Sequence, residues 1–368
     1  MAKLSSKDVR LQYALYGALF GLAFPVIATL FDAYRDLGLG WSGIVEAQRT
    51  QPLHWIIDTA PIFLGFFSCL AGIKQQEVID VNEGLEQKVE QRTEMLNEQN
   101  EELRTIQEEL EDSLLRISQS INYAQRIQDA IISNTKELKH AFPDSFVMFR
   151  PRDVVSGDFP WYVKKDGYHF FAAVDCTGHG VPGAFMSLIG YFLLNKIVKD
   201  QGVVDTDKIL CELHLEVVNV LKQSAAESDV HDGMDLALVR VDEANGEVMY
   251  SGAGNPVYHV RGEDLIEYKA DFWSVGGTQY KKRAPYKAHR FEYKKGDILT
   301  VYSDGISDQF SADGSTKFGF RKIKKHLTSN GNADRPLAEV QSSFENELNE
   351  WMGDHRQMDD MLFMGVKL

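Results

Sequence analysis

The stretch VDCTGHGVPGAF, residues 174–185, gathers an acid, a thiol, a hydroxyl, an imidazole and several glycines in one place. The apolar run HFFAAV that leads into it has the composition of a buried strand, and the run MSLIGYFLL that follows is apolar and helix-like. The sequence therefore predicts a strand that turns on glycines into a helix. Three uses fit these residues: a nucleophile built on Cys176 and His179, a metal site built on Asp175, or a purely structural corner.

The composition of the whole chain limits which classes of protein it can belong to. The chain has 368 residues, enough for two or three domains, and its hydrophobic content of 44% is typical of a protein with a sizeable core. A net charge of -15 argues against a nucleic-acid binder, which needs a basic face to neutralise phosphates. The widely spaced Cys69, Cys176 and Cys211 give neither a disulfide framework nor a CxxC pair, so we expect an intracellular catalytic part.

Much of the acidity lies in one segment. Residues 77–112 hold 13 acidic and 3 basic residues, a net charge of -10. This pattern indicates a solvated helix surface, so the charge does not define a substrate preference.

Residues 1–75 predict a membrane hairpin of two helices. LQYALYGALFGLAFPVIATLF (11–31) carries no charge, and WIIDTAPIFLGFFSCLAGI (55–73) carries only Asp58, near its start. Each run can span a hydrocarbon core of about 30 Å. The alternatives are a pair of buried core helices or a cleaved signal peptide, and the first run is too long and lacks the exit of a signal peptide.

Basic residues flank the two apolar runs. They predict that both ends of the hairpin face the cytoplasm, which places the chain in the inner membrane with its C-terminal region inside the cell. These residues are Lys3, Lys7, Arg10 and Lys74.

Residues 76–141 predict a long coiled-coil helix without proline. Apolar residues recur at a seven-residue interval, at Val89, Leu96, Leu103, Leu110, Ile117, Ala124, Ile131 and Leu138. This seam predicts a parallel homodimer. The segment LEQKVEQRTEMLNEQNEEL (85–103) resembles the signalling helices that join sensors to output domains in bacterial receptors. A passive spacer is the alternative.

Residues 142–368 predict an α+β domain of antiparallel sheets covered by helices. The expected strands include SFVMFRP, YHFFAAVDC, and the pair MDLALVRVD and GEVMYSGAG, with Asn245 and Gly246 in a hairpin turn. Helices are expected in pairs, at 182–198 and 208–222, and again at 320–327 and 336–351. Regular βαβ alternation, the mark of a parallel doubly wound sheet, is absent.

Four acidic motifs stand at predicted strand ends in this region. They are VSGDF with Asp158, VDCTGHG with Asp175, YSDGIS with Asp304, and QMDDM with Asp359 and Asp360. Hard divalent cations prefer oxygen ligands of this kind. Two such ions can activate a water for in-line attack on phosphorus.

The motifs RPRDVVSGDFPW, VDCTGHGVPGAFMSLIG, SGAGNP, YSDGISDQF and DDM, taken in this order, resemble the PPM (metal-dependent) serine/threonine phosphatases in their SpoIIE-like bacterial branch. The resemblance covers residues 142–368. It implies an αββα sandwich with a two-metal centre, of Mn²⁺ or Mg²⁺, at one edge. It also implies that the helix over 182–198 belongs to a switch on which the coiled coil can act.

The resemblance assigns ligand roles to matching residues. Asp175 would bridge both metal ions, and the backbone carbonyl of Cys176, which replaces a common glycine, would join it. Asp158 would act mostly through water. Asp304 and Asp359 would complete the shell of the other metal.

Other positions depart from the family pattern or match it weakly. Thr177 stands where many PPM enzymes place a histidine, so His179 is only a possible general acid. Arg150 and Arg152 are possible phosphate-binding residues, because arginine presents a fork that suits phosphate. Asp360 is a weaker ligand candidate than its neighbour, since adjacent residues of an extended chain point to opposite faces.

Thiol chemistry by Cys176 and His179 is the first rival hypothesis. Asp175 would raise the pKa of the neighbouring thiol, and the three other motif acids would have no role. Those acids are Asp158, Asp304 and Asp359.

The sequence thus predicts a membrane-tethered phosphoserine and phosphothreonine phosphatase, regulated through a dimeric helix. The resemblance suggests a phosphorylated protein substrate, such as an anti-sigma antagonist. A catalytically inactive, membrane-anchored scaffold is the alternative from another class.

Overall fold

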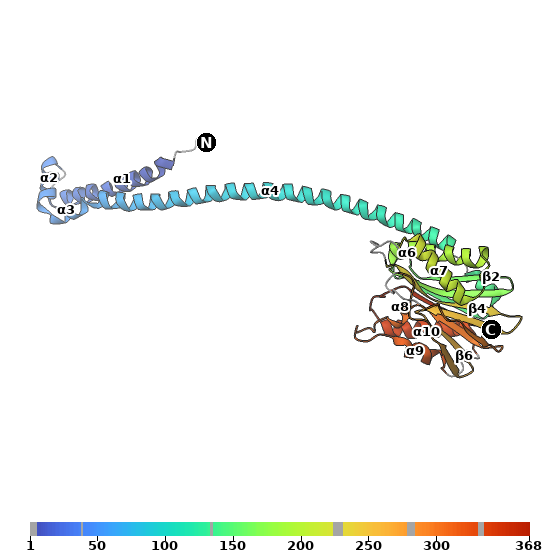
Figure 1. Ribbon diagram of the computed structural model, residues 1–368. Coiled ribbons are helices and arrows are strands. Elements are labelled where there is room, and N and C mark those ends of the chain that lie inside the picture. Colours follow the sequence, from blue (N-terminus) through green and yellow to red (C-terminus); the bar gives the residue numbers. More distant parts are fainter. Residues whose placement is uncertain (1–5, 38–39, 133–134, 224–230, 278–283, 330–334) are drawn as a thin grey trace. The chain divides into compact units, whose positions relative to one another are not determined.

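The computed structural model describes residues 6–37, 40–132, 135–223, 231–277, 284–329 and 335–368 (Figure 1). Lys3, one of the residues that predict orientation, lies outside them. The chain divides into two compact units, Met1–Asp112 and Ser113–Leu368. The predicted boundaries at 75 and 141 are not tested by this division and stay predictions.

The first unit is built from helices at the N-terminal end of the chain. They are α1 (Ser6–Asp32), the π-helical turn η1 (Ala33–Leu37), α2 (Trp41–Thr50), α3 (Pro52–Ile57) and the first part of α4 (Ala60–Ile131). The second apolar run is therefore broken at residues 58–59, and α4 begins there with Pro61 in its first turn, where proline is tolerated.

Small residues let α1 and α4 approach each other closely. A Cβ on Gly21 would lie 2.5 Å from the Cα of Pro61, and one on Gly17 would lie 2.5 Å from the carbonyl oxygen of Leu64. The spacing of Gly17 and Gly21 is the GxxxG pattern that favours close helix packing in membranes. Because the contacts run in opposite directions along the two helices, the pair is antiparallel.

The outward faces of these helices are apolar. Phe20, Ile62 and Phe67 are each more than half exposed. By length and composition, three described stretches could cross a membrane: Val9–Arg35, Pro52–Ala141 and Gly180–Asp200. The third has half of its apolar window buried inside the second unit, so packing accounts for its composition.

The long helix α4 ends earlier than the seam predicts. The seam residues Val89, Leu96, Leu103, Leu110 and Ile117 are each more than half exposed in the described part of the chain. At Ile131 the helix stops, and a short helix, α5 (Thr135–Ala141), follows. Leu138 is fully buried with Phe142 and Tyr162. The prediction of one helix to residue 141 is therefore wrong at its end, because the second unit takes these side chains into its core.

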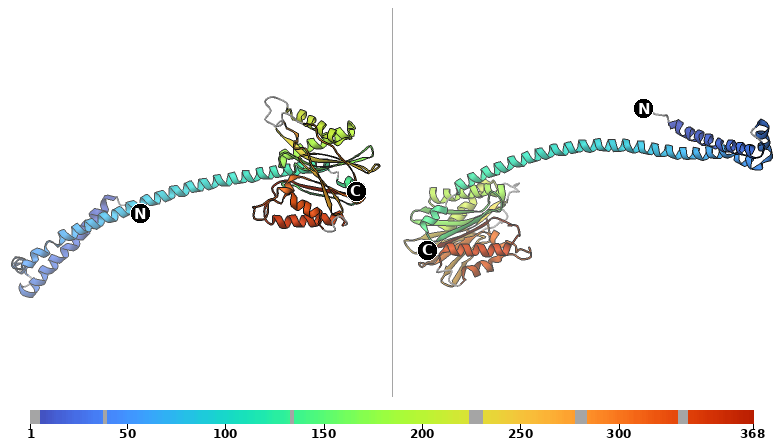
Figure 2. Two further views of the ribbon diagram at one scale, coloured as in Figure 1. Left: turned by 60° about the horizontal axis from the view of Figure 1, so that its bottom comes forward. Right: turned by 180° about the vertical axis from the view of Figure 1, so that it is seen from behind.

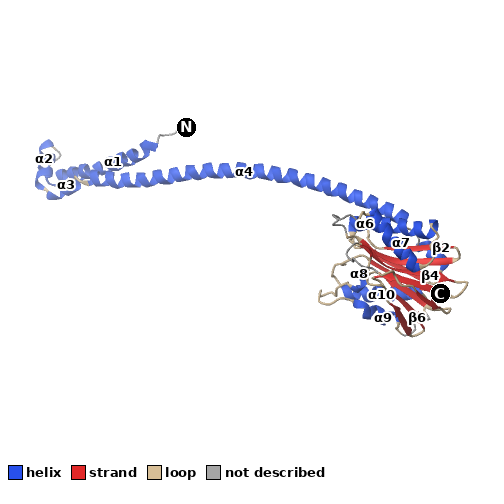
Figure 3. Cartoon of the chain, in the orientation of Figure 1, coloured by secondary structure: helices blue, strands red, loops and turns tan. Residues whose placement is uncertain are grey.

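The second unit contains two antiparallel sheets (Figure 3). In the first, the strand order is β1 (Ser145–Arg150), β11 (Met361–Lys367), β10 (Ile298–Tyr302), β6 (Val257–Arg261) and β7 (Asp264–Tyr268). In the second, it is β2 (Phe159–Lys165), β3 (Tyr168–Cys176), β4 (Gly233–Asp242), β5 (Glu247–Ala253) and β9 (His289–Glu292), with β8 (Val275–Gly276) paired to β4.

Helices cover the outer face of each sheet (Figure 2). The sheet with β3 carries α6 (Gly180–Asn195), the π-helical turn η2 (Lys196–Asp200) and α7 (Thr206–Val220). The sheet with β11 carries α9 (Gly319–Leu327) and α10 (Leu337–Met352), and the single turn α8 (Asp304–Ser307) follows β10.

Three layers of buried side chains lie between these elements: one under α6 and α7, one between the two sheets, and one under α9 and α10. Phe170 packs with Leu194 and Leu213 under α6 and α7, whereas its neighbour Phe171 packs between the two sheets against Leu362. Successive strand residues face opposite sides of a sheet, so one run supplies two cores. The predicted αββα sandwich is confirmed.

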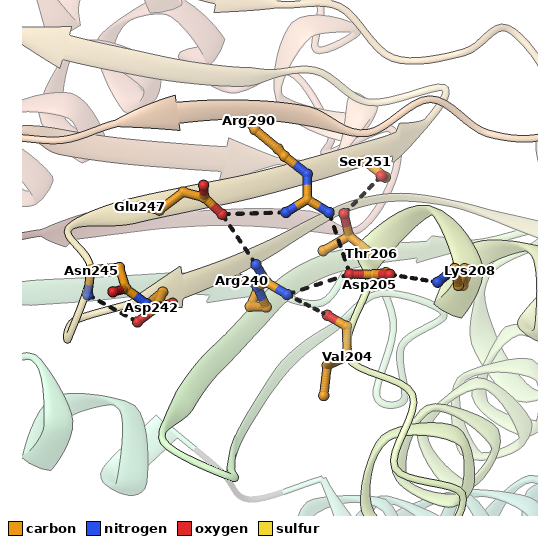
Figure 4. A network of polar contacts seen from close by, with 10 residues as sticks. All are labelled: Val204, Asp205, Thr206, Lys208, Arg240, Asp242, Asn245, Glu247, Ser251 and Arg290. Atoms are coloured by element: carbon orange, nitrogen blue, oxygen red, sulfur yellow. Dashed lines mark hydrogen bonds and ion pairs between the residues drawn. The ribbon is translucent and has the colours of Figure 1, made fainter.

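A buried arginine network fixes the loop before α7 (Figure 4). Arg240 on β4 is 5% exposed and lies with its guanidinium carbon 4.5 Å from the centre of the Tyr168 ring. It donates to the carbonyl of Val204 at 3.2 Å and to Glu247 at 3.3 Å, and lies 3.6 Å from Asp205. The carboxylates of Asp205 and Glu247 thus compensate the buried charge of Arg240.

Candidate active site

The stretch that holds Asp175 folds as a strand, a tight turn and a helix. β3 ends at Cys176, and α6 begins at Gly180 with His179 as its N-cap. Gly178 and Gly180 have φ values of 87° and 64°, which glycine adopts without strain. The turn therefore places Asp175 at the edge of the sheet, as the sequence predicts.

Asp158 reaches the same edge from the neighbouring strand. β2 pairs with β3 so that Phe159 faces Val174, and one step further in this register are Asp158 and Asp175. The loop before β2 packs against the corner, because a Cβ on Gly157 would lie 2.5 Å from the carbonyl oxygen of Gly178. Asp158 is 3% exposed, and its Oδ2 has no hydrogen-bond partner in the described part of the chain.

The other sheet supplies Asp304 and Asp359. Asp304 opens α8 directly after β10, and its backbone N–H donates to Oδ2 of Asp175 at 3.3 Å. Asp359 stands two residues before β11, which pairs with β10. Acids that follow or precede strands of both sheets thus lie at one edge of the sandwich.

These acids lie close enough to perturb one another. Burial raises the pKa of Asp158 well above its usual range, and the carboxylates of Asp360, Asp359 and Asp304 raise it further. Burial also raises the pKa of Asp175 well above its usual range, with added repulsion from Asp158 and Asp304. Such shifts indicate carboxylates gathered in a poorly solvated place.

Cys176 is an unsuitable nucleophile in this setting. Its thiol is buried, and burial followed by the charge of Asp175 raises its pKa well above the ordinary value. Because the thiolate is the reactive form, thiol catalysis at this corner is disfavoured.

The donor set fits hard divalent cations. The buried and unpartnered Oδ2 of Asp158 and the mutual proximity of Asp175 and Asp304 supply carboxylate oxygens of the kind that Mg²⁺ and Mn²⁺ prefer. Among the described residues, no group of three or more His, Cys, Asp or Glu side chains is arranged so that it could hold a metal ion.

Asp360 holds the loop that presents Asp158. Its Oδ1 accepts from the backbone N–H of Arg152, and its Oδ2 accepts from the backbone N–H of Gly157, each at 2.7 Å. Both carboxylate oxygens of Asp360 accept hydrogen bonds from the loop, and the residue is 2% exposed. Asp360 therefore stabilises the conformation of this loop. Asp359 and Asp360 therefore point to different partners, as expected for neighbours in an extended chain.

The two candidate phosphate-binding arginines lie in different surroundings. Arg150 donates through Nη1 to Oδ1 of Asn349 on α10, at 2.8 Å. Arg152 lies in the loop toward Asp158, and its Nε is buried without a hydrogen-bond partner in the described chain.

His179 is exposed and paired. Its Nδ1 lies 2.9 Å from Oδ2 of Asp153, in the loop that leads to Asp158. A carboxylate on one ring nitrogen orients the imidazole and leaves Nε2 available to a substrate. Asp153 was not singled out by the sequence, because a single exposed acid carries no pattern.

Asp235 is a further acid of this edge that sequence reasoning missed. No motif singles it out in the sequence, yet within β4 it lies directly opposite Asp175. A Cβ on Gly254 would lie 2.2 Å from its Oδ2, so only glycine leaves room for it. Burial raises the pKa of Asp235. The antiparallel pairing of β3 with β4 is the signal that could have located it.

The end of α4 contacts the Asp158 loop. Gln128, in the last turn of α4, donates through Nε2 to the carbonyl of Ser156 at 2.7 Å and to the hydroxyl of Ser187 on α6 at 2.8 Å. Its Oε1 accepts from the backbone N–H of Ser156 at 3.2 Å. One buried amide therefore joins the long helix, the Asp158 loop and α6.

A family model described as Stage II sporulation protein E (SpoIIE) matches residues 165–368, more than half of the chain. The fold is similar to the SiaA-PP2C domain of Pseudomonas aeruginosa, with 28% identity and a TM-score of 0.62, covering 70% of this chain and 98% of that chain. No curated protein matches the sequence.

Other solved structures are less similar to this chain in sequence and in fold. The PP2C phosphatase domain and regulatory-domain fragment of the cell fate determinant SpoIIE from Bacillus subtilis is 18% identical, covering 61% of this chain and 62% of that chain, with a TM-score of 0.48. RsbX in complex with magnesium is 16% identical, covering 61% of this chain and 94% of that chain, with a TM-score of 0.44.

Proposed function

Because this chain belongs to the SpoIIE family, we propose that it is a metal-dependent protein phosphatase acting on phosphoserine and phosphothreonine. The observation that carries the proposal is the meeting of Asp158 and Asp175 from one sheet with Asp304 from the other. Asp359 precedes the strand next to β10 and completes the set.

Each group has a distinct part in the proposed reaction. Asp158, Asp175, Asp304, Asp359 and the carbonyl of Cys176 would hold two divalent ions, Mn²⁺ or Mg²⁺. When bound, the ions supply the activated water and the positive charge that in-line attack on phosphorus requires.

Other residues would serve the substrate. Nδ1 of His179 faces Asp153, which would orient the ring. Nε2 would then donate a proton to the serine or threonine oxygen that leaves the phosphate. Arg152 would hold the phosphate, whereas Arg150 is already engaged by Asn349 and is the weaker candidate.

We further propose a membrane-bound, dimeric enzyme whose catalytic unit faces the cytoplasm. The apolar helices at the N-terminus support membrane attachment, and the exposed seam of α4 supports pairing with a second copy. The contacts of Gln128 give that helix a route to the Asp158 loop and α6. The proposed substrate is a phosphorylated signalling protein of the anti-sigma antagonist type, as the family resemblance suggests.

The test uses the full-length chain and a phosphoserine peptide with and without Mn²⁺. We expect Mn²⁺-dependent release of phosphate, its loss in Asp175→Asn, and its retention in Cys176→Ser, which keeps the backbone carbonyl. Activity that survives Asp175→Asn but not Cys176→Ser would refute the metal-dependent mechanism. No turnover in any variant, with folding intact, would favour the scaffold.

A further inference from the structure

Four residues on neighbouring strands form one row across the sheet that contains β3. The register of β2 and β3, continued by one step, sets Asp158 beside Asp175, and the register of β3 and β4 sets Asp175 directly opposite Asp235. The register of β4 and β5, continued by one step, sets Gly254 opposite Asp235. Neighbouring strands lie about 4.8 Å apart. Three successive positions of this row therefore carry a carboxylate.

The row faces the space between the two sheets. Val174 on β3 and Leu236 on β4 pack on the helix side of the sheet, in the core under α6 and α7. Because successive strand residues face opposite sides, the adjoining Asp175 and Asp235 point toward the second sheet. Asp304 comes from that sheet, and its backbone N–H donates to Oδ2 of Asp175. The row thus meets the acids of the second sheet at the edge of the sandwich.

Gly254 makes room for the side chain of Asp235. Its φ is 74°, and a Cβ at this position would lie 2.2 Å from Oδ2 of Asp235. Oδ1 of Asp235 is buried and has no hydrogen-bond partner in the described part of the chain. Gly254 belongs to the motif SGAGNP, so the conformation of this motif fits a carboxylate on the neighbouring strand.

A row of poorly solvated like charges requires a cation. Carboxylates directly opposite each other on neighbouring strands repel, and a buried charge without a partner is costly. Asp158 is 3% exposed and its Oδ2 also lacks a hydrogen-bond partner among the described residues. No three acids of the described chain are already placed to hold a metal ion, so an ion bound here must draw neighbouring members of the row together. Divalent cations bind several carboxylates at once.

We propose that Asp235 is a further ligand residue of the metal centre, in addition to the four acids that the sequence motifs identify. In the row it lies on the side of Asp175 away from Asp158, so it serves a different ion of the pair. Gly254 keeps the place of its carboxylate open. This inference rests on the proposed metal-dependent function and adds a residue to it.

The experiment titrates the detergent-solubilised full-length chain with Mn²⁺ in a calorimeter. We expect the parent to bind two ions, and Asp235→Asn to bind one of them at least about tenfold more weakly. Asparagine keeps the size of the side chain and removes its charge. Asp166→Asn, at the exposed turn between β2 and β3, is the matched control and should bind as the parent does. The rise in melting temperature that Mn²⁺ produces should also be smaller in Asp235→Asn than in the control.

A second pair of variants tests the contact with the glycine. Gly254→Ala places a methyl group where Oδ2 of Asp235 lies, so it should weaken Mn²⁺ binding as well. Asp235→Ala clears that space. Adding Gly254→Ala to Asp235→Ala should therefore weaken Mn²⁺ binding no further, because the two residues act through one contact.

The possible failures of the two proposals can be told apart. If Asp235→Asn binds both Mn²⁺ ions as tightly as Asp166→Asn does, while Asp175→Asn loses binding, the role of Asp235 is overturned and the proposed function stands. A parent chain that binds no Mn²⁺ would overturn both.

Discussion

The charge of Asp175 opposes the folding of the metal-free chain. Burial raises its pKa well above the usual range, so the folded protein holds a proton that the unfolded chain releases near pH 4. The contribution to stability is therefore present below about pH 4 and is lost as pH rises through the raised folded value. Asp175→Asn should abolish phosphatase activity yet stabilise the metal-free protein by about 1–2 kcal/mol at pH 7.5.

Thermal melts in EDTA at pH 5 and pH 8 measure this effect. The gain from Asp175→Asn should be larger at pH 8. Asp166→Asn, at the exposed turn between β2 and β3, is the control and should melt like the parent at both pH values. A metal-free Asp175→Asn variant that is less stable at pH 8 would contradict the account.

Asp360 should act on activity through the loop that it holds. Asp360→Ala leaves the backbone N–H groups of Arg152 and Gly157 without their acceptor, at a cost of about 2–3 kcal/mol in the free energy of unfolding. Urea denaturation measures that cost. Because Asp158 follows this loop, the Mn²⁺ concentration for half-maximal activity should rise as well. Unchanged stability with lost activity would instead indicate that Asp360 binds metal directly.

The pairing of His179 with Asp153 makes a prediction about leaving groups. A serine alkoxide needs a proton to depart, whereas p-nitrophenolate does not. His179→Ala should therefore slow hydrolysis of a phosphoserine peptide about 10²-fold and that of p-nitrophenyl phosphate only slightly. Asp153→Asn should show the same selectivity in weaker form. Equal slowing of both substrates would assign the pair a structural role.

Individual residues differ in how far the sequence reveals them. Asp158, Asp175 and Asp304 stand in motifs that contain glycine, and Asp359 precedes a predicted strand, so these four acids could be proposed to meet. Asp235 could not, because its nearness to Asp175 comes from strand register and not from any local pattern.

The seating of α6 against the catalytic corner depends on a glycine. A Cβ on Gly183 would lie 2.2 Å from the carbonyl oxygen of Gly178, and backbone cannot yield cheaply. Gly183→Ala should cost about 1–3 kcal/mol in stability and most of the activity. Gly190 lies on the same helix, but its Cβ would meet the flexible end of Met234 at 3.0 Å, so Gly190→Ala should be tolerated. Equal effects of the two variants on activity would contradict this view of the corner.

Some elements could not be predicted from the sequence, and β2 and the end of α4 show why. β2 contains Pro160, which lowers its resemblance to a strand, and the structure accommodates it because β2 lies at the edge of its sheet. The end of α4 at Ile131 was also missed. The heptad spacing continues to Leu138, and only the tertiary core decides that Leu138 belongs to it.

At the scale of the whole molecule, the exposed seam predicts assembly. Replacing Leu103 and Leu110 together with lysine should convert a dimer into a monomer, because buried seam positions do not accept paired charges. Light scattering of the detergent-solubilised chain measures this. Glu101 and Glu108, off the seam, replaced together with lysine form the control and should leave the dimer intact. A seam variant that stays dimeric would place the interface elsewhere.

The position of β11 has a consequence for biosynthesis. This strand lies between β1 and β10, although its residues are translated more than 200 positions after β1. On the ribosome, α4 and the strands β2 to β5 can emerge first, while β1 still lacks the strand that joins it to the rest of its sheet. Asp359 stands just before this last strand, so the acids of the two sheets can gather only when synthesis of the chain is nearly complete.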